Sequence, residues 1–141
     1  MLKILVPVDG SSQAQRAVNE VLILAKNGTE LEIHLLNVQI PIDSGHARMF
    51  VDQNEVDAYH REEGLAALTA ARTLLDAAGV VYSHHIVVGH VAESIVRYAK
   101  AQNIDKIVMG THGRSGLLNT LLGSVAHDVL KHSLVPVSLV K

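Results

Sequence analysis

The sequence contains no cysteine and no tryptophan, and it has only one phenylalanine and three tyrosines among 141 residues. Without cysteine there are no disulfides, iron–sulfur clusters, thiolate zinc sites or cysteine nucleophiles. This composition agrees with the cytoplasm, where we expect the protein to reside. The shortage of aromatic rings disfavours a flavin cofactor, which needs stacking partners. We expect the four rings to lie outside the ligand site: Phe50, Tyr59, Tyr82 and Tyr98.

Runs of one charge and long apolar runs are also missing. The formal net charge is −2 and no stretch of Lys or Arg occurs, so the electrostatic footprint of a nucleic-acid-binding protein is absent. No apolar stretch reaches the roughly 18 residues of a membrane-spanning helix. The apolar start of the chain is interrupted by Pro7 and ends at Asp9 without a small-residue cleavage site, which favours a buried strand over a signal sequence. We therefore expect neither nucleic-acid binding nor membrane insertion.

What is present is the composition of one packed α/β domain, 1–141, in which 48% of the residues are hydrophobic and 18% are charged. Short apolar segments alternate with segments of helical periodicity, which is typical of a parallel sheet with helices on both faces. The first helix starts with a capping-box pattern, Ser12 followed by Gln15, and ends at Asn27–Gly28. The predicted strands are 4–8, 31–38, 80–88, 106–109 and 135–140, and the later helices are 55–78, 92–102 and 124–132.

The segment Gly110–Ser124 has the chemistry of a phosphate-binding loop. It follows a predicted strand, carries glycines at 110 and 113, and after nine further residues reaches Gly123 and Ser124, where a helix is predicted to begin. Glycine lets backbone N–H groups approach a phosphate, and a helix start offers further N–H groups and a favourable dipole. The Ser124 hydroxyl suits a phosphate or a metal ion. Alternatively, the first two glycines only form a turn and Gly123 only packs.

Together with four other segments, this loop resembles the universal stress protein family over essentially the whole chain. The loop matches the G-x2-G-x9-G-[ST] motif of the family's ATP-binding members without a departure, whereas residues 39–53 show no family signature. The resemblance implies a five-stranded parallel sheet in the order 3-2-1-4-5, bound ATP, and a homodimer formed through the C-terminal strand. The other matching segments are Ile4–Ser11, Leu35–Val38, Gly89–Ile95 and Val135–Val140.

The resemblance also implies roles for individual residues. Asp9 corresponds to the acidic residue that holds the ribose and helps with the metal-bound phosphates, and Ser124 is the second residue that we expect at the metal. The backbone of Val38 corresponds to the position that reads adenine. The residues implied to bind ATP are Pro7, Val8, Asp9, Val38, Met109, Gly110, His112, Gly113, Arg114, Gly123, Ser124 and Val125.

The implied strand order brings two of these segments to one crevice. In a doubly wound sheet the ligand lies outside the carboxyl ends of the strands, where the strand order reverses. In the order 3-2-1-4-5 this point lies between the first and fourth strands, which are followed by Asp9 and Gly110. Asp9 has a second interpretation as a structural cap of the first helix, and the two roles are compatible.

The charged and titratable side chains of the loop affect how the triphosphate of bound ATP is neutralised and whether it can be hydrolysed. No lysine occurs between Gly110 and Ser124, so Arg114 is the one fixed cation of the segment and we expect Mg²⁺ to neutralise the triphosphate. Hydrolysis needs a group that positions or activates water, and His112 is the only evident candidate. We therefore expect an ATP-binding stress-response regulator with slow or no hydrolysis. A slow ATPase or a nucleotide-transfer enzyme stays open as the alternative.

Other patterns favour further functions less strongly. The nine histidines suggest a metal site, but His84 and His85 point to opposite faces of a strand and no ligand spacing stands out. A receiver-type signalling domain requires an aspartate after its third strand, where this chain has Val87–Gly89. Leucines at 117, 118, 121 and 122 are expected to fold over the nucleotide or to pack on the sheet, and alternatively mark a surface for an unidentified protein partner. The apolar strand Val135–Val140 favours pairing with a second copy if it lies at a sheet edge.

Overall fold

The computed structural model describes residues 1–42, 52–113 and 122–141. Strands and helices alternate along these residues, as the sequence predicts. The strands are β1 (Leu2–Pro7), β2 (Leu31–Gln39), β3 (Tyr82–Val88), β4 (Lys106–Gly110) and β5 (Val137–Val140). The helices are α1 (Ser12–Lys26), α3 (Gln53–Ala77), α4 (Val91–Ala101) and α5 (Ser124–His132).

The described strands form one parallel sheet in the order β3-β2-β1-β4-β5, which confirms the order that the family resemblance implied. The order reverses between β1 and β4, which pair in the register Ile4 with Lys106 and Leu5 with Ile107. Because the strands are parallel, their carboxyl ends lie at the same edge of the sheet. Segments that follow β1 and β4 are therefore neighbours in space, although about 100 residues separate them in sequence.

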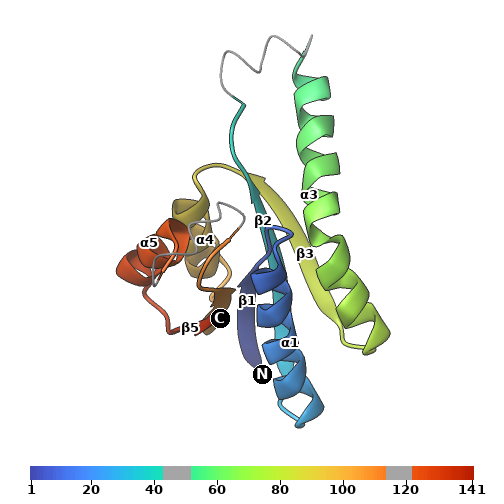
Figure 1. Cartoon of the computed structure of the whole chain (residues 1–141), viewed down its shortest axis with the longest axis vertical. Helices are drawn as coiled ribbons and strands as arrows, with labels where there is room; N and C mark the ends of the chain where they lie inside the picture. Colours follow the sequence, from blue (N-terminus) through green and yellow to red (C-terminus); the bar gives the residue numbers. More distant parts are fainter. Residues whose placement is uncertain (43–51, 114–121) are drawn as a thin grey trace.

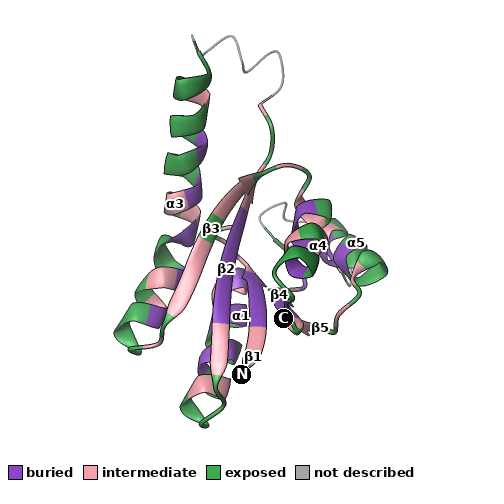
Figure 2. Ribbon diagram, turned by 180° about the vertical axis from the view of Figure 1, so that it is seen from behind, coloured by how far each residue is buried: buried purple, intermediate pink, exposed green. Residues whose placement is uncertain are grey.

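Helices cover both faces of the sheet, with α1 and α3 on one side and α4 and α5 on the other (Figure 1). Alternate residues of the strands point to opposite faces, and this divides the core into two apolar clusters. Ile4, Val6 and Leu35 pack with α1 and α3, whereas Leu5 and Ile107 pack with α4 and α5. The inner strands β1, β2 and β4 contain buried residues, as Figure 2 shows for β1 and β2, whereas the edge strands β3 and β5 contain none, because only the inner strands have a neighbour on both sides.

The start of α1 differs by one residue from the prediction. The N-cap is Ser11, whose side chain accepts a hydrogen bond from the Ala14 N–H at 3.2 Å, and Ser12 is the first helical residue. The predicted capping box of Ser12 and Gln15 is therefore wrong. The Asp9 carboxylate holds the Ser11 N–H at 2.9 Å and fixes the cap one position earlier. The predicted end is confirmed, because Asn27 is the C-cap and Gly28 has a φ of +90°.

The last strand begins later than predicted. Val135 donates its N–H to the Ser133 hydroxyl and accepts a hydrogen bond from the same hydroxyl, so its backbone is engaged in a local turn. Pro136 has no N–H, and only its carbonyl joins the ladder, through the Ile107 N–H at 3.0 Å. Regular pairing starts at Val137, and β5 is an edge of the sheet as predicted.

The N-terminal half of α3 extends past the carboxyl ends of the strands (Figure 1). The Asp52 side chain caps this helix by accepting a hydrogen bond from the Glu55 N–H at 2.9 Å. Buried residues recur every three or four positions, which is the period of a helix with one face against the core. The buried residues of α3 are His60, Gly64, Leu68, Ala71 and Leu75. The overhanging half of α3 thus forms a wall beside the edge of the sheet at which the loops converge.

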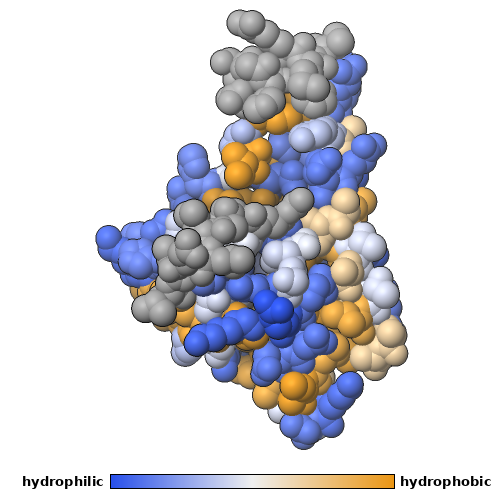
Figure 3. Space-filling model, viewed as in Figure 1, coloured by the Kyte–Doolittle hydropathy of each residue, from blue (hydrophilic) through white to orange (hydrophobic). Residues whose placement is uncertain are grey.

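On the face shown in Figure 3, apolar residues form separate patches within a mostly hydrophilic surface. Single exposed apolar side chains, such as Ile23 and Leu130, are ordinary on protein surfaces. Among the described helices, none has both the length and the apolar character that a membrane crossing would require.

Gln15 supplies a test of the packing of α1. Its side-chain amide is buried, and neither Nε2 nor Oε1 forms a hydrogen bond with any residue that the structure describes. Burying an amide without a partner costs about 1–3 kcal/mol. We expect Gln15→Leu to stabilise the protein by about 1 kcal/mol, which raises the Tm by roughly 4 °C for a chain of this size. Thermal unfolding followed by circular dichroism measures this change.

Arg16→Leu is the matched control, because Arg16 is exposed on the same turn of α1. We expect its Tm to stay close to that of the wild type. A Gln15→Leu variant that unfolds at a lower temperature than the wild type would contradict the interpretation of Gln15 as an unpartnered amide.

Candidate functional site

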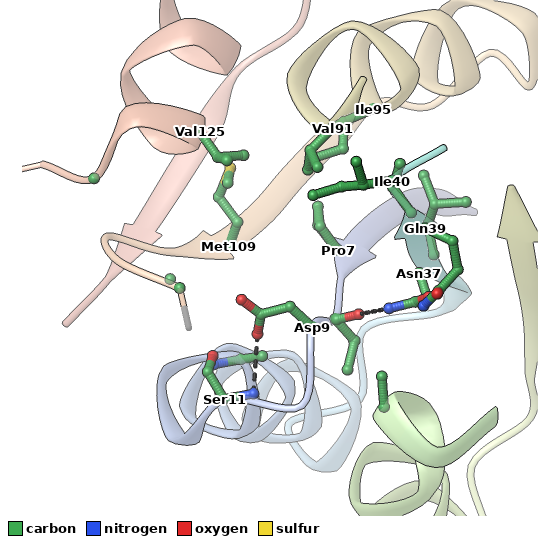
Figure 4. Close-up of a pocket in the computed structure, with 18 of the residues that line it drawn as sticks. Pro7, Asp9, Ser11, Asn37, Gln39, Ile40, Val91, Ile95, Met109 and Val125 are labelled. Atoms are coloured by element: carbon green, nitrogen blue, oxygen red, sulfur yellow. Dashed lines mark hydrogen bonds between the residues drawn. The ribbon is translucent and has the colours of Figure 1, made fainter. Parts of the chain in front are cut away.

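A cavity of about 580 Å³ lies at the carboxyl ends of β1, β2 and β4, where the strand order reverses. Its walls come from α3 and from the starts of α4 and α5 (Figure 4). Arg114, which the resemblance assigned to the phosphates, lies outside the described residues. Every other residue predicted to bind ATP lines the cavity: Pro7, Val8, Asp9, Val38, Met109, Gly110, His112, Gly113, Gly123, Ser124 and Val125.

The turn after β1 places Asp9 at the cavity. Gly10 has a φ of +85°, a left-handed conformation that glycine adopts without strain, and a Cβ atom added to it would lie 3.5 Å from the Cα of Ala67 in α3. The Asp9 Oδ1 atom accepts the hydrogen bond from the Ser11 N–H, while Oδ2 lies against Gly113 of the glycine loop. The cap of α1 is therefore Ser11 and not Asp9, whose carboxylate instead holds the N–H of the cap residue, and its second oxygen faces the loop.

The glycines of the loop make room for protein groups. A Cβ atom at Gly110 would lie 2.8 Å from the Cβ of Gln13, and one at Gly123 would lie 3.1 Å from the Thr111 carbonyl oxygen. A Cβ at Gly113 would collide with the Asp9 carboxylate. None of the three has a positive φ. The predicted reason for these glycines, close approach of a phosphate, is therefore incomplete, because at each position the missing side chain admits a neighbouring protein group.

The two described ends of the loop meet at Thr111, which is buried. Its carbonyl accepts a hydrogen bond from the Gly123 N–H at 2.7 Å, and its own N–H donates to the Val140 carbonyl at 3.0 Å. The start of α5 is therefore held beside the ends of β4 and β5. Ser124 and Val125, the first residues of α5, line the cavity as a result.

The helix starts around the cavity differ in how their N–H groups are satisfied. The side chain of Ser11 caps α1 and that of Asp52 caps α3. Within the described residues, no side chain caps α4 or α5. At α4 the cavity wall is apolar, formed by Val91 and Ile95, whereas α5 begins next to the glycine loop. The first N–H groups of α5 are therefore best placed to bind an anion.

An apolar slot occupies the part of the cavity away from Asp9. Side chains from the ends of β1 and β2 and from α4 approach it from one side, and side chains of β4 and α5 lie across from them (Figure 4). The residues of the slot are Pro7, Ile40, Val91, Ile95, Met109 and Val125. A slot of this kind, next to polar groups that fix orientation, suits a flat and weakly polar ring.

Two polar residues of β2 that line the cavity were missed from the sequence. Asn37 is only 3% exposed, and its Nδ2 donates a hydrogen bond to the Val8 carbonyl at 2.9 Å. The Gln39 Nε2 in turn donates to the Asn37 Oδ1 at 2.7 Å. A buried asparagine is costly unless it is hydrogen-bonded, so an Asn within an apolar strand was a signal that could have marked this position.

Helix α3 contributes Tyr59, Glu63 and Ala67 to the cavity. The expectation that every aromatic residue lies outside the site is therefore wrong for Tyr59. The reason is the length of α3, which carries this residue past the sheet and along the cavity. Tyr82 and Tyr98 do not line the cavity, and Phe50 lies outside the described residues.

Histidines gather elsewhere on the sheet. The His34 Nδ1 lies 2.7 Å from the Tyr98 hydroxyl and its Nε2 lies 2.6 Å from the Glu32 carboxylate, so both ring nitrogens have protein partners. The His85 ring stacks on His34 at a centroid distance of 6.1 Å. Burial raises the pKa of Tyr98 to about 12 and lowers the pKa of His85. Across the described ranges, no three His, Asp or Glu side chains are arranged to hold a metal ion.

A parallel sheet whose strand order reverses between β1 and β4, with helices on both faces, defines the class of doubly wound α/β proteins. Within this class, the chain belongs to the universal stress protein family, whose sequence model matches residues 1–141. The family expected from the motifs is thereby confirmed.

Similar proteins cover nearly the whole chain. Universal stress protein YxiE of Bacillus subtilis (strain 168) is 32% identical, over 99% of this chain and 98% of YxiE. The structure of MJ0577 of Methanocaldococcus jannaschii aligns with a TM-score of 0.84 and 34% identity, over 99% of this chain and 95% of that one. A universal stress protein in complex with cAMP aligns with a TM-score of 0.71 and 25% identity, over 99% and 97% of the two chains.

Proposed function

We propose that the chain binds ATP with Mg²⁺ in the cavity between β1 and β4, and that it acts as a cytoplasmic stress-response regulator with slow or no hydrolysis. The observation that carries this proposal is the start of α5. Its N–H groups lack a side-chain cap within the described residues and are held beside the glycine loop, whereas α1 and α3 are capped by Ser11 and Asp52. Uncapped N–H groups at the positive end of a helix dipole favour a phosphate.

The chemistry of the cavity suits the remaining parts of the nucleotide. The apolar slot between Pro7 and Met109 would take the adenine ring, with the backbone of Val38 at its edge. Gly110 and Asp9 would contact the ribose, and the loop and α5 would surround the phosphates. The proposal is supported by a family member of the same fold that was solved in complex with cAMP, another adenine nucleotide.

Asp9 and Ser124 are the chain's own groups for a metal ion bound with the phosphates. Mg²⁺ prefers oxygen ligands, and the carboxylate and the hydroxyl both line the cavity. The metal would offset the negative charge that Asp9 adds beside the phosphates. The chemistry that Mg²⁺ supplies is charge neutralisation, and the chain's residues only hold and orient the ligand.

Ser124→Asp tests the phosphate assignment. An acidic residue in the first turn stabilises a helix by about 0.3–1 kcal/mol through the helix dipole, but here its charge would repel the phosphates. We expect the Kd for ATP to rise at least about tenfold, or ~1.4 kcal/mol, while the Tm stays unchanged or rises. Titration calorimetry and thermal unfolding measure the two effects.

Ser12→Asp is the matched control, because Ser12 is likewise an exposed serine at the first position of a helix but does not line the cavity. We expect it to leave the ATP affinity close to that of the wild type. Equal affinities of the two variants would show that the phosphates do not bind at the start of α5.

Asp9→Asn tests the metal. The asparagine Oδ1 retains the acceptor for the Ser11 N–H, so the turn is preserved while the charge is lost. We expect removal of Mg²⁺ with a chelator to weaken ATP binding to the wild type at least about tenfold, and to weaken binding to Asp9→Asn much less. Titrations of both proteins with and without Mg²⁺ supply the four affinities. A wild-type affinity that does not respond to Mg²⁺ would exclude the metal role.

A slow ATPase is the second candidate, and His112 is the observation that favours it. The ring lines the cavity, and its Nδ1 lies 3.0 Å from the Thr111 hydroxyl, so it is oriented beside the proposed phosphate site. Steady release of phosphate over many turnovers, lost in His112→Ala, would identify the chain as an enzyme.

We also propose that the chain forms a homodimer through Val135–Val140. β5 is the edge strand beside β4, and an apolar edge strand is stabilised by pairing with the same strand of a second copy. Sedimentation velocity is expected to show a dimer, and a monomeric species at micromolar concentration would contradict it.

A further inference from the structure

Gln13 joins α1 to the start of the glycine loop across 98 residues of sequence. Its Oε1 accepts hydrogen bonds from the His112 N–H at 2.6 Å and from the Thr111 hydroxyl at 3.1 Å. A backbone N–H can only donate, so the oxygen of the Gln13 amide must face the loop. The orientation of this side chain is therefore determined by its partners.

The same contacts favour one tautomer of the His112 ring. The Thr111 hydroxyl has one proton, and it is donated to Gln13. The hydroxyl oxygen, 3.0 Å from the His112 Nδ1, must therefore accept a hydrogen bond from that nitrogen. The contacts of Gln13 thus favour the His112 tautomer that carries its proton on Nδ1.

These contacts lie at the point where the glycine loop begins and returns. Gly110 has no side chain, and this allows the Cβ of Gln13 to pack against it. The Thr111 carbonyl binds the Gly123 N–H, so whatever fixes Thr111 also fixes the start of α5. Gln13 itself does not line the cavity, but all the residues that it contacts or supports here do: Gly110, Thr111, His112 and Gly123.

We propose that Gln13 is a positioning residue of the nucleotide site, which orients the His112 ring and holds the base of the phosphate loop without adding charge. The part of this inference that concerns ATP rests on the proposed function. A glutamate would accept the same hydrogen bonds, but it would place a negative charge next to the phosphates. The neutral amide supplies the acceptor alone.

The test combines ¹⁵N NMR of the His112 ring in the ligand-free protein with titration of ATP. In Gln13→Leu we expect the preference for the Nδ1–H form to be lost and the Kd for ATP to rise about tenfold, since two hydrogen bonds of ordinary strength disappear. In Gln13→Glu we expect the Nδ1–H form to persist while ATP binding still weakens. Gln15→Leu, the same substitution two residues further along α1, should change neither property.

If the His112 ring of Gln13→Leu keeps its preference for the Nδ1–H form, the inference is overturned, whatever happens to ATP binding. If that preference is lost but the ATP affinity is unchanged, Gln13 has no role in the nucleotide site. If the wild type binds no ATP, the proposed function fails, whereas loss of the Nδ1–H form in Gln13→Leu still supports Gln13 as the group that orients His112.

Discussion

The parallel pairing of β1 with β4 is the constraint on which the site depends. These strands pair directly only because the chain, after winding outward to β2 and β3, crosses back to the other side of β1. At this reversal the segments that follow β1 and β4 turn to opposite faces of the sheet. The turn at Asp9 and the glycine loop therefore lie on either side of an open cavity. The sheet thus determines where the polar groups of the site lie, and the loops set only the exact positions of these groups.

Close packing at the loop ends has the same origin. Gly110, Gly113 and Gly123 each lie against another part of the site, respectively Gln13, the Asp9 carboxylate and the Thr111–His112 backbone. These contacts bring α1, β4 and α5 together before any ligand enters. A site assembled in this way loses little conformational freedom on binding, which favours retention of a ligand. The glycine spacing in the sequence therefore reflects protein packing, and the proposed function adds the approach of a ligand as a second reason.

Element types could be predicted from the sequence because apolar runs and helical periodicity report burial directly. The strand order came from the family resemblance, since periodicity does not determine which strands are neighbours. Other features depend on tertiary contacts. The position of the cap at Ser11 follows from its hydrogen bond to Asp9. Tyr59 reaches the cavity because α3 extends past the carboxyl ends of the strands. Gln13 had no signal, because its partners follow β4 and are distant in sequence.

The overhang of α3 divides that helix into two parts of unequal local stability. In the overhanging half the buried positions are His60 and Gly64, whereas Leu68, Ala71 and Leu75 anchor the other half in the core. We therefore expect backbone amides near Gln53 to exchange with solvent at a lower free energy of opening than those near Leu75. The cavity wall that carries Tyr59 and Glu63 belongs to this less firmly anchored half, so a loosening of the wall would leave the packing of the sheet intact.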